Sequence, residues 1–194
     1  MTDIQQLILG ALNRPDSRWV SAVRRFKAAA EKSTVYRRAC GECNECCTTM
    51  GVHEIKKPAG KPCPHLVGRG CGIYETRPPS CRSYECLWLS GITPDSWQPK
   101  KYGIVMDIAR IDPKSTSTDL KDYGFFLRET REGAFGTHPQ KYAQAIALAS
   151  ILCLSTPNIR HIGIHHWMAK SVLVFKVTQE GGMAQIELLK PPSA

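Results

Sequence analysis

The chain has 194 residues, 42% of them hydrophobic and 22% charged, and a formal net charge of +9. This length suits one domain or two small ones, and it can bury a core without help from metal or disulfides. No apolar run is long enough to cross a bilayer, which excludes a chain that spans the membrane through helices.

Residues 1–38 carry the positive excess, with 8 basic and 3 acidic side chains. Apolar residues recur there at helical spacing and predict two amphipathic helices, over residues 3–12 and 17–32. We expect these helices to pack on the body of the protein with a solvated basic face. Contact of that face with nucleic acid stays open as an alternative that the sequence does not favour, and no membrane partner is expected. No signal peptide precedes them, so we expect a cytoplasmic protein with reduced cysteines.

Residues 39–90 form a second predicted unit, rich in glycine and proline and poor in aliphatic side chains. This unit holds eight of the nine cysteines of the chain, namely Cys40, Cys43, Cys46, Cys47, Cys63, Cys71, Cys81 and Cys86. A segment of this composition has too little apolar mass to fold around a core, so we expect a loop-rich module organised by metal. Disulfides are the alternative, but they need an oxidising compartment.

The spacing of these cysteines predicts that their thiolates bind a metal ion or an iron–sulfur cluster. A C-x2-C turn directs both sulfurs at one ion, and thiolates bind zinc and iron–sulfur clusters. The opening C-x2-C-x2-C matches the start of the bacterial ferredoxin run, which ligates a 4Fe–4S cluster, and Cys63, followed by proline, is a candidate fourth ligand. Adjacent side chains diverge, so Cys46 and Cys47 serve two separate centres, or one ligates and the other supports it. Eight thiolates suffice for one or two centres, and the sequence leaves zinc and iron–sulfur both open.

Metal binding would also change the charge of the chain. Eight ionised thiolates would bring the net charge from +9 to +1, and two divalent ions would return it to +5. Arg77 and Arg82 flank Cys81, and we expect Arg77 to cap carbonyl groups and Arg82 to offset thiolate charge near the metal. Binding of a substrate phosphate or carboxylate by these guanidinium groups is the alternative.

Four motif blocks occur in order, reading CGECNECC at 40–47, KPCPHL at 61–66, CGIYE at 71–75 and RPPSCR at 77–82. They resemble the YkgJ-type cysteine-cluster family, described as a zinc- or iron-chelating domain that is also found in flagellin lysine methylases. The resemblance implies metal or iron–sulfur binding by residues 40–86. It implies no established reaction for the free-standing members.

Residues 91–194 read as an α+β region that packs on the cysteine module. Strands are predicted over residues 102–111 and 123–130, then a helix to about residue 154, with Thr137 as N-cap and Pro139 in the first turn. Further strands are predicted at 161–167, 171–178 and 184–189. We describe this small sheet-plus-helix region as ββαββ-type, with an antiparallel or mixed sheet.

Cys153, His165 and His166 are the remaining candidate ligands. Cys153 shares the apolar face of the predicted helix with Tyr142, Ile146 and Ala149, which indicates a thiol of the core. His165 and His166 fall in a predicted strand and therefore point to opposite faces, so neither is expected to bind metal.

Three functions are consistent with these features of the sequence. The favoured one is a metal-binding protein that holds zinc or an iron–sulfur cluster through clustered thiolates. The alternatives are an iron–sulfur enzyme that modifies a protein or RNA in the manner of a methylase, and a zinc-stabilised module that binds nucleic acid. No catalytic triad, paired catalytic carboxylates or cofactor-binding loop stands out, so the sequence names no catalytic residue and no substrate.

Overall fold

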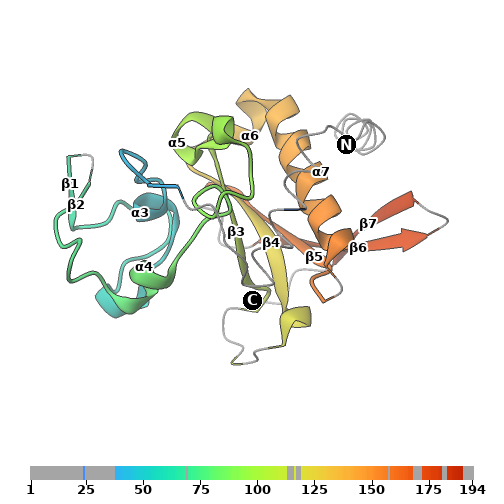
Figure 1. Cartoon of the computed structure of the whole chain (residues 1–194), viewed down its shortest axis with the longest axis horizontal. Coiled ribbons are helices and arrows are strands. Elements are labelled where there is room, and N and C mark those ends of the chain that lie inside the picture. Colours follow the sequence, from blue (N-terminus) through green and yellow to red (C-terminus); the bar gives the residue numbers. More distant parts are fainter. Residues whose placement is uncertain are drawn as a thin grey trace.

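The computed structural model describes residues 24, 38–68, 70–112, 116, 119–156, 158–167, 172–180 and 183–189. The fold is mixed α+β, with a sheet and one long helix on one side and the short elements of the cysteine-rich segment on the other (Figure 1). The helices predicted within residues 1–38 lie almost wholly outside the described residues, so they stay predictions. Within the described part of the chain, no helix combines the length and the apolar character that crossing a membrane requires.

The main sheet has five strands in sequence order, β3 to β7. They are β3 (Ile104–Arg110), β4 (Tyr123–Glu129), β5 (His161–His165), β6 (Leu173–Glu180) and β7 (Met183–Leu189). All neighbours pair antiparallel except β4 and β5, which run parallel. Parallel strands need a crossover connection, and α7 (Pro139–Ser155) supplies it.

The core lies where α7 packs on the sheet. Leu148 and Leu152 of the helix are fully buried, and they join a cluster that includes Phe125 and Leu127 from β4 and Ile162 from β5. Phe125 and Leu127 are two residues apart, so strand alternation turns both side chains to one face. The predicted helix face is confirmed, because Tyr142, Ile146, Ala149 and Cys153 are all buried.

Three details of the sequence-based description were wrong. The ββαββ label counts four strands, whereas the sheet has five, close to the five ranges that the sequence predicts. The first strand starts two residues later than expected, because Pro99 begins a short helix, α5 (Pro99–Tyr102), that ends at Gly103 in the left-handed conformation with φ 86°. Thr137 is not the N-cap of α7. It ends α6 (Ala134–Thr137), and His138 takes the cap position without a side-chain hydrogen bond.

The cysteine-rich segment consists of turns and very short elements. They are α3 (Cys46–Thr49), η1 (His53–Ile55), β1 (Leu66–Val67), β2 (Gly70–Cys71) and α4 (Pro79–Ser83). Two more short 3-10 helices lie outside this segment, η2 (Asp95–Trp97) before α5 and η3 (Leu120–Asp122) before β4. Among the described residues between 38 and 86, Val52 is the single apolar side chain that is buried. The main core begins only at Leu87. The segment therefore has almost no hydrophobic core of its own.

Gly163 in β5 offers a test of the packing on the sheet. A Cβ at this position would lie 2.3 Å from the Phe126 ring, whereas a Cβ at Gly136 in α6 would meet no described atom within 4 Å. We expect Gly163→Ala to lower the free energy of unfolding by about 2 kcal/mol, because a buried ring must move to make room. Chemical denaturation of the two alanine variants checks this. A Gly136→Ala variant that loses as much stability would contradict the account.

Candidate metal centre

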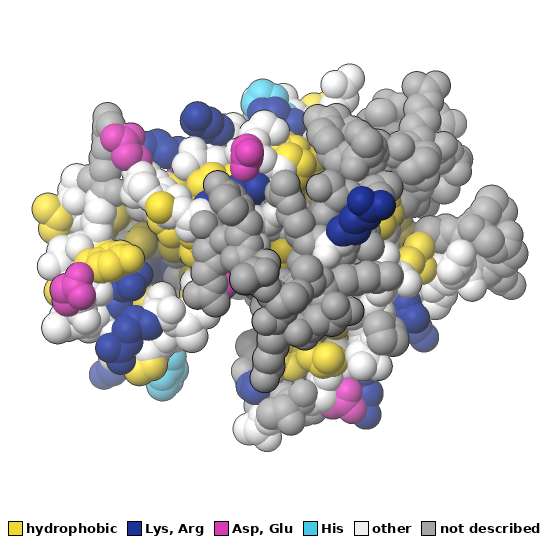
Figure 2. Space-filling view, in the orientation of Figure 1, with side chains coloured by type: hydrophobic (Ala, Val, Ile, Leu, Met, Phe, Trp, Pro, Cys, Tyr) yellow, Lys and Arg dark blue, Asp and Glu magenta, His cyan; other side chains and the backbone are white. Residues whose placement is uncertain are grey.

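Seven of the eight clustered cysteines line one cavity of about 330 Å³. The eighth, Cys86, lines an adjoining cavity of about 500 Å³, which four of the seven also line. All nine cysteines of the chain are free thiols. In the space-filling view, the lobe that holds this segment shows hydrophobic-class side chains, a class that includes cysteine, beside Lys and Arg side chains (Figure 2).

The run from Cys40 to Cys47 places four sulfurs through two tight turns. The Cys43 N–H donates to the Cys40 carbonyl at 2.9 Å, and the Cys47 N–H donates to the Asn44 carbonyl at 2.9 Å. Gly41 adopts a positive φ of 54° inside the first turn. Cys46 and Cys47 then open the short helix α3. These turns bring residues three apart together, as a C-x2-C pair requires.

Two further cysteines reach the cavity through the small hairpin of β1 and β2. The Cys63 N–H donates to the Cys47 carbonyl at 2.9 Å, and the Leu66 N–H donates to the Cys63 carbonyl at 3.0 Å. Cys71 pairs directly with Leu66 across the hairpin. The hairpin therefore places Cys71 beside the turn that begins at Cys63, and Cys63 is joined to Cys47 in α3.

Cys81 comes from α4, and Cys86 lies just after it, where the chain joins the main core. The Leu89 N–H donates to the Cys86 sulfur at 3.4 Å, and the Leu87 N–H donates to the Met106 carbonyl of β3 at 2.8 Å. Cys86 also packs against the main hydrophobic core. Of the eight thiols, this one is therefore anchored most directly to the sheet.

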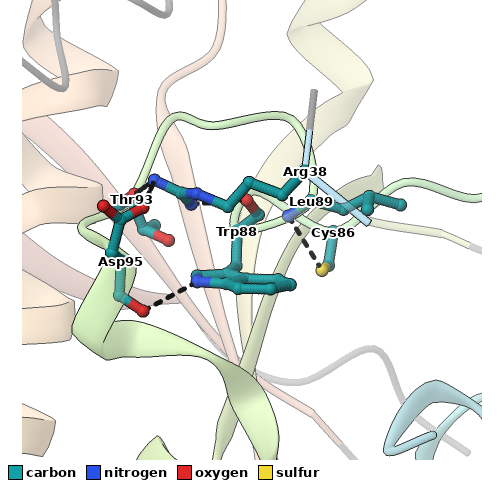
Figure 3. Close-up of polar contacts among 6 residues, drawn as sticks. All are labelled: Arg38, Cys86, Trp88, Leu89, Thr93 and Asp95. Carbon is teal, nitrogen blue, oxygen red and sulfur yellow. Dashed lines mark hydrogen bonds and ion pairs between the residues drawn. The ribbon is translucent and has the colours of Figure 1, made fainter. Parts of the chain in front are cut away.

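Arg38 fixes the chain just before the first cysteine (Figure 3). Its guanidinium donates to the carbonyls of Trp88 at 2.6 Å and Thr93 at 2.9 Å, and it lies 2.7 Å from the Asp95 carboxylate. The side chain is 7% exposed, and its backbone N–H donates to the Leu89 carbonyl at 2.9 Å. Arg38 thus ties the start of the cysteine run to the loop that carries Cys86.

A second anchor joins the segment to the sheet through a buried carboxylate. The Tyr84 hydroxyl donates to Asp107 at 3.0 Å, and the Arg128 guanidinium approaches the same carboxylate at 3.0 Å. Asp107 is 1% exposed, so both partners are needed to satisfy its charge. Burial and the Asp107 charge raise the pKa of Tyr84 well above its usual value, which keeps its hydroxyl a donor.

Lys57 places a buried positive charge at the wall of the cavity. It is 5% exposed, and its ammonium donates to the carbonyls of Thr48 at 3.2 Å, Pro58 at 3.1 Å and Met50. Burial lowers the pKa of Lys57, and the opposing charge of nearby thiolates raises it. Those thiolates are Cys63, Cys47, Cys46 and Cys81. Lys57 therefore satisfies three carbonyls and also offsets thiolate charge.

The thiols differ in how readily they ionise. The mutual interaction of the adjacent Cys46 and Cys47 thiols raises the pKa of Cys46 and lowers the pKa of Cys47. Burial raises the pKa of Cys86 to about 11, and the charges of Cys40 and Cys43 add to the rise. Metal binding would have to displace these protons.

The two arginines take different places. The Arg77 Nε donates to the Tyr74 carbonyl at 2.8 Å, and its guanidinium carbon lies 3.6 Å from the centre of the Tyr74 ring. Its charge counters the effect of burial on the pKa of Cys40 and Cys47. Arg82 is exposed and lines the adjoining cavity. Arg77 therefore caps a carbonyl, as the sequence predicts. Arg77 also offsets thiolate charge, which the sequence analysis assigns to Arg82.

The donor set fits a soft or borderline metal, because eight thiol sulfurs line two adjoining cavities with Lys57 and Arg77 beside them. The sulfurs are not yet at coordinating positions. Among the described residues, no group of three or more His, Cys, Asp or Glu side chains has the arrangement of a metal site. Metal binding would therefore require the sulfurs to move closer together.

The remaining candidates lie away from the cavities. Cys153 is fully buried in the main core, and burial raises its pKa to about 12. His166 follows the end of β5, 3.6 Å from the buried Glu129 carboxylate. Glu129 accepts hydrogen bonds from the backbone N–H groups of Phe135 at 2.8 Å and Trp167 at 2.7 Å, which joins α6 to the turn after β5.

Sequence reasoning missed Lys57, Arg38 and Tyr84 as parts of the site. Lys57 follows another lysine and precedes a proline, which resembles an exposed loop, so no local pattern distinguishes it. Arg38 was counted only among the basic residues of the N-terminal region. Their roles depend on contacts between distant parts of the chain, 55 residues apart for Arg38 and Thr93.

Comparisons of the chain with protein-family models, with curated proteins and with solved structures found no match. The resemblance of residues 40–86 to the YkgJ-type family therefore stays an expectation that rests on the four motif blocks.

Lys57→Met tests whether the buried ammonium organises the segment. The variant leaves three carbonyls without their donor, so we expect local stability to fall by about 2 kcal/mol. Cleavage within residues 38–86 by a protease that does not cut at lysine should become at least roughly tenfold faster. Lys56→Met is the matched control, because Lys56 is the exposed neighbour. Equal cleavage rates in the two variants would show that the ammonium has no such role.

Proposed function

We propose that the chain is a metal-binding protein that holds zinc or an iron–sulfur cluster through cysteine thiolates. The observation that carries this proposal is the shared lining of one cavity of about 330 Å³ by seven cysteines drawn from residues 40 to 81. These cysteines lie in turns, beside a hairpin and in short helices with few apolar side chains, and all of them line this cavity. Free thiols are frequent in protein cores, but so many around one cavity are typical of ligand sets.

The charge distribution supports the same function. Lys57 and Arg77 both lie beside the thiols, where two positive charges would offset part of the negative charge of a loaded thiolate site. The Leu89 N–H already donates to the Cys86 sulfur, a contact that stabilises a thiolate ligand. When bound, the metal would supply the cohesion that the segment lacks, since site formation and folding are coupled in small metal modules.

The resemblance to the YkgJ-type family points to the same chemistry, and a reducing cytoplasm would keep the thiols available. An iron–sulfur enzyme that modifies a protein or RNA, and a zinc-stabilised module that binds nucleic acid, remain alternatives without a specific supporting contact. The basic helices on which nucleic-acid binding would depend fall largely outside the described residues.

Serine substitution tests the proposal. We expect Cys43→Ser and Cys81→Ser to lower the bound metal per chain, because serine offers no thiolate. Cys153→Ser should leave the metal content unchanged and cost only packing, on the order of 1–2 kcal/mol. Zinc, iron and labile sulfide are measured on protein purified without oxygen. Brown colour with broad absorption near roughly 400 nm would indicate iron–sulfur, whereas zinc is colourless.

The Cys153→Ser control and the unmodified chain show which part of the proposal fails. If Cys153→Ser strips metal as fully as the other two variants, the division into eight ligands and one core thiol is wrong. If the unmodified chain carries neither zinc nor iron, the proposed function itself is wrong.

A further inference from the structure

The lining of the two cavities separates the cysteines. Cys47, Cys63 and Cys71 line only the smaller cavity, and Cys86 lines only the larger one. The other four line both, and they form the boundary between the two spaces; these are Cys40, Cys43, Cys46 and Cys81. Cys86 and the three cysteines of the smaller cavity do not face a common space, which favours two centres with the shared four divided between them.

Backbone contacts group the cysteines of the smaller cavity. The Cys63 N–H donates to the Cys47 carbonyl, and the hairpin that follows brings Cys71 opposite Leu66, three residues after Cys63. We assign Cys81 to this side as its fourth sulfur, because it lines the smaller cavity with these three cysteines, although it also borders the larger cavity. Lys57 also lines the smaller cavity, where its buried positive charge lies near Cys47, Cys63 and Cys81, and near Cys46 at the boundary.

The remaining cysteines group around Cys86. The turn from Cys40 to Cys43 closes with a hydrogen bond of 2.9 Å, and both residues line the larger cavity with Cys86. Cys46 also lines that cavity, and it completes the C-x2-C-x2-C run that can surround one centre. This side lies against the main core through Cys86 and the Arg38 anchor, whereas the other side is carried by α3, the hairpin and α4.

The adjacent Cys46 and Cys47 fall on opposite sides of this division. Cys46 ends the C-x2-C-x2-C run and lines both cavities, whereas Cys47 lines only the smaller cavity and its carbonyl accepts the hydrogen bond from Cys63. Contacts across the division also exist, since the charges of Cys40 and Cys47 interact. The two sides are therefore neighbours rather than remote sites.

We propose that the cysteines form two four-thiolate centres, one made by Cys40, Cys43, Cys46 and Cys86 and the other by Cys47, Cys63, Cys71 and Cys81. This inference rests on the proposed function and specifies it: each centre has four sulfur ligands, the number found in four-cysteine zinc sites and in cubane iron–sulfur sites. The first centre is fastened to the sheet, and the second is enclosed by the loop-rich lobe.

Two substitutions, each in a cysteine that lines a single cavity, test the division. We expect Cys86→Ser and Cys71→Ser each to remove about half of the zinc or iron bound per chain, and the double variant to remove nearly all of it. Metal content is measured on the full chain purified without oxygen, with Cys153→Ser as the control. A Co²⁺ titration of the reduced, metal-free chain should show two thiolate-bound equivalents in the unmodified protein and one in each single variant.

Because Cys86 packs against the core, Cys40→Ser provides a second variant of the same centre at an exposed position. Circular dichroism shows whether each variant keeps the sheet. If either single variant of a folded chain loses all its metal, or if the double variant loses no more than one single variant, the two-centre division is wrong while metal binding stands. An unmodified chain without bound zinc or iron, and without Co²⁺ binding, would contradict the proposed function as well.

Discussion

The structure depends on how a segment with almost no core of its own is held together. Between residues 38 and 86, Val52 is the one buried apolar side chain among the described residues, yet this stretch brings eight thiols to two adjoining cavities. The hydrophobic effect cannot account for the order of such a segment, because little apolar surface leaves water. Hydrogen bonds and anchors hold the chain in position, and thiolate–metal bonds would supply the remaining cohesion.

The anchors explain why the cysteine segment has a defined place on the α+β body. Arg38 joins the start of the cysteine run to the loop around Trp88, and the buried Asp107 joins Tyr84 to the sheet through Arg128. Removing one partner of such a buried pair is costly, because it leaves an uncompensated charge. The sheet and α7, which have their own core, thus support the cysteine segment at both anchors.

The charges near the thiols follow from the same constraint. Four thiolates around one ion carry a net negative charge that a low-dielectric site must offset. Lys57 supplies a positive charge on the side of Cys47 and Cys63, held in place because its ammonium satisfies three carbonyls. The charge of Arg77 acts on Cys40 and Cys47, on both sides of the proposed division.

Much of the sheet region was predictable, because alternation in strands and the apolar face of α7 are local patterns. The five strands lie close to their predicted ranges, and the buried positions of α7 match. Pro99 and Gly103 were not recognised as a helical turn, since a four-residue helix leaves no periodicity to detect. The cysteine spacing identified the candidate ligands but not Lys57 or Arg38, whose roles arise from contacts made only after the chain folds.

Limited proteolysis of the full chain with and without a strong metal chelator tests the central claim most directly. If bound metal organises the segment, chelation should open cleavage sites within residues 39–90 while residues 104–189 stay resistant, because the sheet and α7 have their own core. Restoring the metal under reducing conditions should restore resistance. Equal resistance of the cysteine segment in the metal-loaded and chelated chain would contradict the account.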